Sequence, residues 1–280
     1  MNYKLGLYEK SMPEELQVIE KLVEAKEAGF DYLELSIDET DAKLARLDWD
    51  KDEISEISKN ILLLGVPIKS ICLSGHRRFP LGSRDAATRT RCLEILNKAV
   101  QLASDLGVSI IQLAGYDVYY EQGGEDTKAY FADNLAKSVE VAAREGIVLA
   151  FETMETPFLD TVEKAMSWIK KINSPYLQIY PDIGNLTNAS VMYKTNPVED
   201  LKQGSGHVAA VHLKETTPGV YREVPFGHGH VNFSQMAKTA FDLGVRMFVG
   251  EFWHVGSRGW REILRQNNLF LRNILDDDKE

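Results

Sequence analysis

Short apolar runs alternate with longer amphipathic segments along the chain, and this alternation occurs eight times. Each run is five to seven residues long, which is typical of a strand buried on both faces of a parallel sheet. The runs lie at residues 3–7, 32–36, 68–74, 110–115, 147–152, 177–182, 208–214 and 247–252.

The segments between these runs repeat apolar residues at helical spacing, as in PEELQVIEKLVEAKEAGF (13–30) and RCLEILNKAVQLASDLG (91–107). Several end on a glycine shortly before the next run, which is the expected stop of a helix. These glycines are Gly29, Gly65, Gly107, Gly146 and Gly244. Eight strand–helix units in succession predict an α/β fold, a single (β/α)8 barrel.

No linker or change of composition divides the chain, so we expect residues 1–280 to form one barrel, the catalytic domain. The longer loops follow the third, fourth, sixth and seventh predicted strands. Such loops lie at the C-terminal face of a barrel, where barrel enzymes carry their active sites. Candidate chemistry is therefore sought at the strand ends.

Four metal-binding residue types occupy the ends of four successive predicted strands: Glu152, Asp182, His212 and Glu251. They are 30, 30 and 39 residues apart, one strand–helix unit each, so they should meet at one rim of the barrel. Any one of them alone is adequately explained as a loop anchor or helix cap. Together, three carboxylates and one imidazole predict a site for one divalent cation, Mn²⁺, Co²⁺, Zn²⁺ or Mg²⁺. Without a cation, at least one of three acids this close should be protonated.

Charge and composition narrow the classes of partner. The net charge is −10 and the basic residues are scattered, which argues against binding to nucleic acid or to an anionic membrane. Only Cys72 and Cys92 are present, too few for a disulfide framework or a cysteine-rich zinc module. No signal peptide or transmembrane stretch is visible, so we expect a cytoplasmic protein.

Several motifs together resemble one enzyme family along the whole chain. They are CLSGHRRFPLGS (72–83), LAFETMETPF (149–158), YPDIGN (180–185), VHLKET (211–216), REVPFGHG (222–229) and GEFW (250–253). The sequence resembles the phosphopentulose 3-epimerases of L-ascorbate and related sugar-acid catabolism, also labelled hexulose-6-phosphate isomerases, among the xylose-isomerase-like TIM barrels. The resemblance implies an isomerase that interconverts L-xylulose 5-phosphate and L-ribulose 5-phosphate. It also places metal ligands at the four strand-end residues.

Inverting carbon 3 of a ketose phosphate needs two bases, one on each face of an enediolate whose charge a metal can stabilise. Glu152 and Glu251 come from non-adjacent strands and can flank the substrate, and the resemblance implies the same pair. Asp182 and His212 would then hold the metal more passively.

Further residues are candidates for holding the substrate. The resemblance implies contacts by Arg222 and by Glu155, although Glu155 could instead cap the helix after Pro157 and Arg222 could form a loop salt bridge. The other candidates are Asn185, Lys214 and, for the phosphate, Ser74, His76 and Arg77. Free-sugar relatives carry His where this chain has Asn185, and relatives often carry Glu where it has His228.

Other functions compete with epimerisation. An aldose–ketose isomerase acting on a hexulose phosphate could use the same metal and carboxylates. A non-catalytic sugar-phosphate sensor would be expected to lack one of the four ligands, and none is missing. A phosphodiesterase of the endonuclease IV type would need more than 6 His and a basic surface. A homodimer is a weaker expectation from the resemblance.

Overall fold

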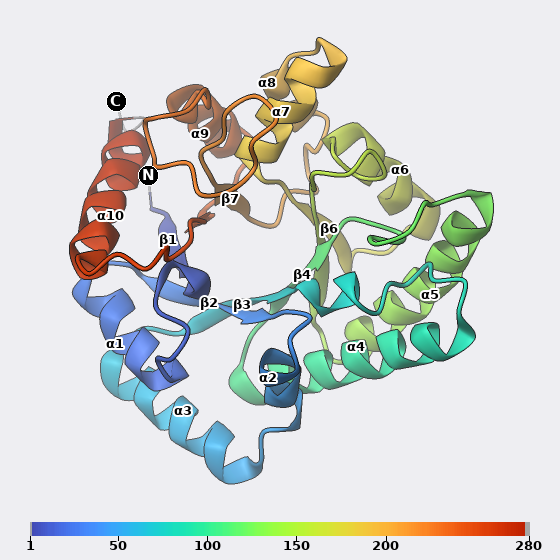
Figure 1. Cartoon of the computed structure of the whole chain (residues 1–280), viewed down its shortest axis with the longest axis horizontal. Helices are drawn as coiled ribbons and strands as arrows, with labels where there is room; N and C mark the ends of the chain where they lie inside the picture. The colour runs from blue at the N-terminus through green and yellow to red at the C-terminus, as the bar shows by residue number, and fades with distance from the viewer. Residues whose placement is uncertain (1, 278–280) are drawn as a thin grey trace.

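The computed structural model describes residues 2–277 and contains an eight-stranded parallel sheet surrounded by helices (Figure 1). The strands are Lys4–Tyr8 (β1), Tyr32–Ile37 (β2), Ile68–Leu73 (β3), Ile110–Ala114 (β4), Val148–Glu152 (β5), Leu177–Tyr180 (β6), Val211–Leu213 (β7) and Met247–Gly250 (β8). All eight predicted strands are thus confirmed. The seventh is shorter than predicted, at 211–213 instead of 208–214.

The α-helices lie around the outside of the strands in Figure 1. They are Val18–Glu27 (α1), Asp41–Leu44 (α2), Lys51–Leu64 (α3), Ala86–Leu106 (α4), Glu125–Arg144 (α5), Val162–Ile172 (α6), Ile183–Tyr193 (α7), Pro197–Lys202 (α8), Phe233–Asp242 (α9) and Trp260–Asp277 (α10). Short 3-10 turns lie at Glu9–Ser11 (η1), Ala45–Asp48 (η2) and Ser74–Arg77 (η3). As predicted, α3 and α4 end at Gly65 and Gly107, whose φ angles of 70° and 68° suit glycine.

The strand order is β6-β5-β4-β3-β2-β1-β8-β7, and every paired strand is parallel. Two isolated bridges, Ile179 to Val208 and Asp182 to His212, connect β6 to β7 and nearly close the barrel. The second bridge joins two of the four candidate ligands. The gap between β6 and β7 is therefore closed at the candidate site itself.

Alternation along the strands produces two packed layers. Outward residues such as Leu33 and Leu35 pack against the helices, whereas Tyr32 and Tyr180 fill the lumen. Gly6 makes room for the Tyr32 ring, since a Cβ at position 6 would lie 2.3 Å from the ring atom Cε2. The same alternation turns Glu34 into the lumen, where it is fully buried.

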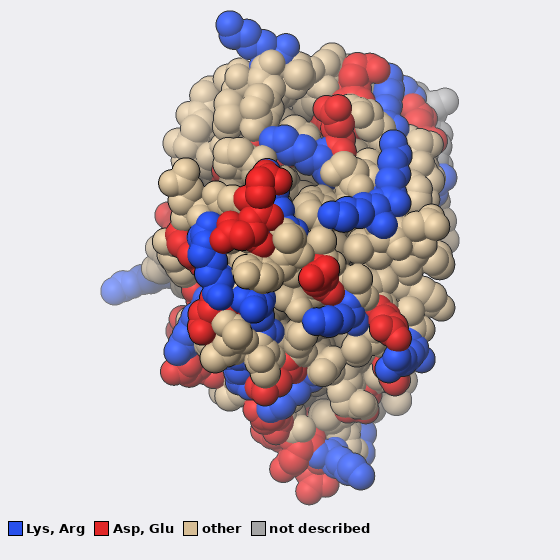
Figure 2. All heavy atoms as spheres, turned by 90° about the vertical axis from the view of Figure 1, so that its right-hand side faces the viewer, with Lys and Arg blue, Asp and Glu red and all other residues tan. Residues whose placement is uncertain are grey.

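The molecular surface carries charges of both signs. On the face drawn in Figure 2, Lys and Arg side chains alternate with Asp and Glu side chains. No helix within residues 2–277 has both the length and the apolar character that crossing a membrane requires. That residues 1–280 make one catalytic domain stays a prediction, and residues 1 and 278–280 lie outside the described chain.

Candidate functional site

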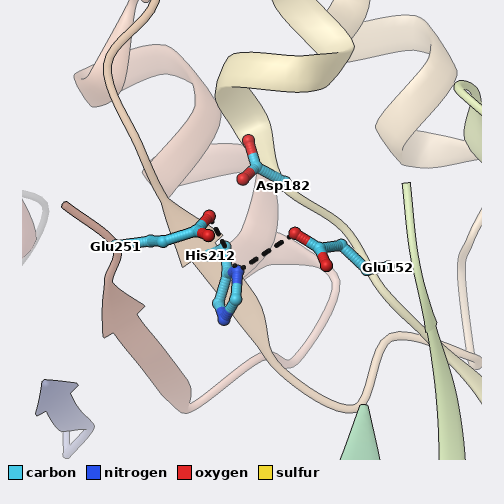
Figure 3. Close-up of side chains that lie close together, drawn as sticks. All are labelled: Glu152, Asp182, His212 and Glu251. Carbon is cyan, nitrogen blue, oxygen red and sulfur yellow. Dashed lines mark hydrogen bonds and ion pairs between the residues drawn. The ribbon is translucent and has the colours of Figure 1, made fainter. Parts of the chain in front are cut away.

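The four strand-end side chains meet at the C-terminal rim of the barrel. One ligand atom from each of Glu152, Asp182, His212 and Glu251 lies within 4.8 Å of all the others, and all four residues are buried. Figure 3 shows the carboxylates of Glu152 and Glu251 approaching from opposite sides, with the His212 ring between them. This cluster of three carboxylates and one imidazole could hold a metal ion.

Asp182 is positioned by the turn from β6 into α7. It is the N-cap of α7, and its Oδ1 accepts a hydrogen bond from the backbone N–H of Asn185 at 2.8 Å. The backbone N–H of Asp182 donates to Thr153 Oγ1 at 3.0 Å, which ties the tip of β5 to the tip of β6. Asp182 is therefore a helix cap through one oxygen and leaves its other oxygen to the cluster.

His212 is fully buried and has a distinct environment at each ring nitrogen. Its Nδ1 faces the cluster, 3.1 Å from Glu251 Oε2 and 3.5 Å from Glu152 Oε1. Its Nε2 faces the lumen, 2.6 Å from Glu34 Oε1. The amide nitrogen of Gln112 lies 3.3 Å from Nδ1.

Lys214 is buried beside the carboxylates. Its ammonium lies 2.7 Å from Asp182 Oδ2 and 3.6 Å from Glu251 Oε2. Burial alone would lower the pKa of Lys214, but Asp182 and Glu251 outweigh burial and raise it. Lys214 thus supplies one positive charge to a cluster rich in negative charge.

The electrostatics of the cluster indicate that one lysine does not neutralise it. Burial and the charge of Glu251 raise the pKa of Asp182 to about 7, although Lys214 opposes this shift. Burial would also raise the pKa of Glu251, but Lys214 and His212 lower it below its usual value. Burial would lower the pKa of His212, whereas Glu34 and Glu251 raise it well above 6.5. A divalent cation fits this donor set in charge and in ligand type.

A cavity of about 80 Å³ opens above the cluster. Its lining residues are Tyr8, Lys10, Cys72, Ser74, Arg77, Glu152, Met154, Glu155, Asn185, Lys214, Tyr221, Arg222, Glu251 and Trp253. The structure therefore places both predicted catalytic carboxylates on the cavity wall. It also brings most of the predicted substrate-binding residues to the same wall.

The comparisons with known proteins agree with this geometry. The family described as "Xylose isomerase-like TIM barrel" matches residues 22–274. L-ribulose-5-phosphate 3-epimerase UlaE of Salmonella paratyphi A is 46% identical over 240 residues, which cover 86% of this chain and 83% of that protein. The chain belongs to the L-ribulose-5-phosphate 3-epimerase family of xylose isomerase-like TIM barrels.

Solved structures of more distant sugar epimerases share the fold of this family member. An L-ribulose 3-epimerase superposes with a TM-score of 0.79 at 18% identity, covering 99% of this chain and 96% of that one. The D-psicose 3-epimerase of Clostridium cellulolyticum, solved with D-tagatose, gives a TM-score of 0.81 at 15% identity, covering 97% and 99%.

In this epimerase-family chain, Glu155 and Arg222 meet at the rim of the cavity. Arg222 Nη2 donates to Glu155 Oε1 at 2.8 Å, and Tyr119 OH donates to the same oxygen at 3.0 Å. The alternative that Glu155 caps the following helix is wrong, because the N-cap of α6 is Thr161. Arg222 does form the predicted salt bridge, and its partner is Glu155. It also lines the cavity.

Asn185 presents an unpaired acceptor in this epimerase-family site. Its amide nitrogen donates to the backbone oxygen of Thr153 at 2.7 Å, whereas its Oδ1 is buried and has no hydrogen-bond partner among the described residues. Because an unpaired buried oxygen is costly, this atom is suited to accept a hydrogen bond from a ligand hydroxyl.

Two histidines of the family motifs lie away from the cavity wall. His76 is buried in η3, and burial lowers its pKa to about 4, opposed only by a hydrogen bond involving the backbone of Cys92 in α4. His228 is exposed and lines a separate pocket with Trp253 and Phe270. The structure does not bring His76 to the wall that Ser74 and Arg77 line.

Sequence reasoning missed some lining residues of this epimerase-family cavity. Lys10 lies within η1, the turn that follows β1, and its Nζ pairs with Asp38 Oδ2 at 2.5 Å. Trp253 lies two residues after Glu251, so alternation of side chains along the chain could have indicated it. Tyr221 is adjacent to Arg222 in a long loop, where spacing carries little information.

Proposed function

We propose that this protein interconverts L-xylulose 5-phosphate and L-ribulose 5-phosphate by inverting carbon 3. The observation that carries the proposal is that Glu152 and Glu251 approach each other from opposite sides (Figure 3) and both line the cavity. Inversion requires a proton to leave from one face and another to arrive at the opposite face. Two carboxylates on opposite sides of one cavity meet that requirement, and the 46% identity to an L-ribulose-5-phosphate 3-epimerase supports this substrate.

The residues that would hold the metal are Glu152, Asp182, His212 and Glu251, with Mn²⁺, Co²⁺, Zn²⁺ or Mg²⁺ as the candidate ions. A bound divalent cation would supply Lewis acidity that stabilises negative charge on the C2 oxygen of the substrate. Asp182, the N-cap of α7, and His212 are both fully buried and are not among the residues that line the cavity. Glu152 and Glu251 line the cavity and can also reach the substrate.

The proton transfers follow from the two carboxylates. One of them takes the proton from C3, and the electron pair of the broken C–H bond moves toward the C2 carbonyl to give an enediolate. The opposite carboxyl group, protonated beforehand, donates its proton to the other face of C3. Each turnover leaves the two groups with exchanged protonation states, so the reaction can run in both directions.

The remaining cavity residues would orient the sugar phosphate. We assign the unpaired Asn185 Oδ1 to a substrate hydroxyl, and Arg222 together with Glu155 to the sugar at the rim. Lys214 would contact substrate oxygen beside the carboxylates. Ser74 and Arg77, the first and last residues of η3 and both on the cavity wall, would contact the phosphate.

A proton-exchange experiment tests the reaction directly. Metal-loaded protein is incubated with L-xylulose 5-phosphate in D₂O, and deuterium incorporation is located by NMR. Deuterium at C3 with formation of L-ribulose 5-phosphate is the expected result. Deuterium at C1 would establish the aldose–ketose isomerase, and binding without any incorporation would establish the sensor.

Substitution of the two bases tests their roles. Glu152→Gln and Glu251→Gln should each lower kcat by about 10²- to 10⁴-fold or more while the barrel stays folded, because the amide cannot accept the C3 proton. Far-ultraviolet circular dichroism checks folding, and Glu145→Gln on the exposed surface serves as the matched control. Near-normal turnover in either active-site variant would refute the two-base scheme.

A further inference from the structure

Glu34 is a buried carboxylate that no step of the proposed reaction uses. It lies inside the lumen on β2, has no solvent exposure and is separated from the cavity by the His212 ring. An ionised carboxylate in such a place is costly unless donors surround it. The partners of Glu34 therefore indicate why the barrel tolerates it.

Each oxygen of Glu34 receives hydrogen bonds from side chains of other strands. Oε1 lies 2.6 Å from His212 Nε2, whereas Oε2 accepts from Ser70 Oγ at 2.6 Å and from Tyr180 OH at 2.9 Å. Donors from β3, β6 and β7 thus hold one carboxylate from β2. Ser70 and Tyr180 leave the carboxylate a single orientation, with Oε1 aimed at the imidazole.

The pair with Glu34 determines which nitrogen of His212 is available to the cluster. Because Glu34 is an acceptor, its hydrogen bond keeps a proton on Nε2. The lone pair that a metal requires is then on Nδ1, the nitrogen that faces Glu152 and Glu251. Ligating histidines commonly donate their other N–H to a carboxylate, which fixes the ring and makes it a stronger ligand.

We infer that Glu34 is a positioning residue for the metal site, which it orders by holding His212 with the proton on Nε2 and Nδ1 toward the metal. Glu34 acts through His212 and does not touch the substrate. The inference rests on the metal site of the proposed function, but not on which carbon the enzyme inverts.

Metal affinity and NMR test this role independently of turnover. The probe is Zn²⁺, titrated into the metal-free full-length protein against a competing chelator. Glu34→Gln should weaken Zn²⁺ binding by about 10- to 100-fold, because the neutral amide removes the charge that strengthens the imidazole. In the Zn²⁺-loaded unsubstituted protein labelled with ¹⁵N-histidine, His212 should show its proton on Nε2.

The matched control is Tyr32→Phe. It removes a buried hydroxyl group inside the same lumen. That hydroxyl donates a hydrogen bond to the backbone oxygen of Phe248 at 2.9 Å. The Zn²⁺ affinity of this variant should lie within about 3-fold of that of the unsubstituted protein. Its ¹⁵N-histidine spectrum should still show the proton of His212 on Nε2. The control therefore separates the effect of removing the Glu34 carboxylate from a general disturbance of packing inside the lumen.

Several results would overturn the inference. If Glu34→Gln binds Zn²⁺ as tightly as the unsubstituted protein does, the inference is wrong, but the proposed function is unaffected. If Glu34→Gln does not fold, the NMR measurement on the unsubstituted protein decides, and a proton on Nδ1 with Zn²⁺ on Nε2 contradicts the assignment. Failure of the unsubstituted protein to bind Zn²⁺ would refute both the inference and the metal site.

Discussion

Arg77 lines the cavity, and its guanidinium makes few hydrogen bonds or ion pairs with other side chains. Its guanidinium lies over the Tyr119 ring at 4.7 Å, and its one ion pair within residues 2–277 is a long one with Glu39, at 3.7 Å. Its Nε is buried without a hydrogen-bond partner among the described residues. A guanidinium with free donors facing a cavity is suited to a phosphate oxygen.

Arg77→Gln should therefore raise KM for L-ribulose 5-phosphate by about 10- to 100-fold, because hydrogen bonds to charged groups contribute about 1.5–3 kcal/mol. Steady-state kinetics with the phosphate ester and with free L-ribulose measure the effect. The neighbouring Arg78, which pairs with Asp41 at 2.7 Å, provides the control Arg78→Gln. An equal loss with both sugars would show that Arg77 does not contact the phosphate.

Strand register predicted which four side chains converge, because the ends of parallel strands share one edge. The position of Lys214 was also within reach, since residues 212 and 214 point to the same side of a strand. The contact of Glu34 with His212 could not be predicted from the sequence, because it crosses the lumen from β2 to β7. Which inward residues meet there depends on the tilt and stagger of the closed barrel.

At the scale of elements, Glu9 connects the first strand of the barrel to the helices that follow it. It begins η1 just after β1, is fully buried and contacts three cations. Lys21 Nζ of α1 lies 3.3 Å from Oε1, Arg46 Nη1 of η2 lies 2.6 Å from Oε2, and Lys43 of α2 also pairs with Oε1. Burial alone would raise the pKa of Glu9, but these cations lower it to about 2.

Glu9→Gln should destabilise the protein by about 3–5 kcal/mol, because it leaves buried cations without their counterion. Chemical denaturation at pH 7 measures this loss. Since the folded-state pKa lies below the unfolded one, the contribution is present above pH about 4.5 and disappears as the pH falls toward 2. The difference between the two proteins should therefore shrink in acid, and a constant difference would contradict the assignment.

The elements themselves were largely predictable, because eight apolar runs and their helix-ending glycines repeat regularly. The short seventh strand was not. Its predicted start at 208 lies where Val208 makes only an isolated bridge to Ile179, and the regular ladder with β8 begins at Val211. An apolar run records burial, whereas a strand boundary depends on which neighbour is in register.

At the scale of the whole molecule, the candidate metal site joins the two edges of the sheet. Its ligands lie in or just after β5, β6, β7 and β8, and the bridge between Asp182 and His212 is one of the two isolated bridges that join β6 to β7 in place of a regular ladder. A cation bound there would link the parts of the barrel that the ladder leaves open. Such a site cannot exist in the unfolded chain, so its occupancy is coupled to folding.

Removal of metal should therefore lower the melting temperature. At a Mn²⁺ concentration 100 times Kd, binding adds about 2.7 kcal/mol, which corresponds to roughly 5 °C for a protein of this size. The pKa of Asp182, raised to about 7 in the metal-free barrel, gives the effect a pH dependence. A raised carboxyl pKa stabilises the fold below pH about 4, and this contribution disappears as the pH rises through 7. The shift caused by Mn²⁺ should thus be larger at pH 8 than at pH 5.

Calorimetry with and without chelator measures the shift in melting temperature. Asp182→Asn, which lacks one ligand, should lose most of this shift. A melting temperature insensitive to chelator and to Mn²⁺ at both pH values would contradict a metal ion at this junction.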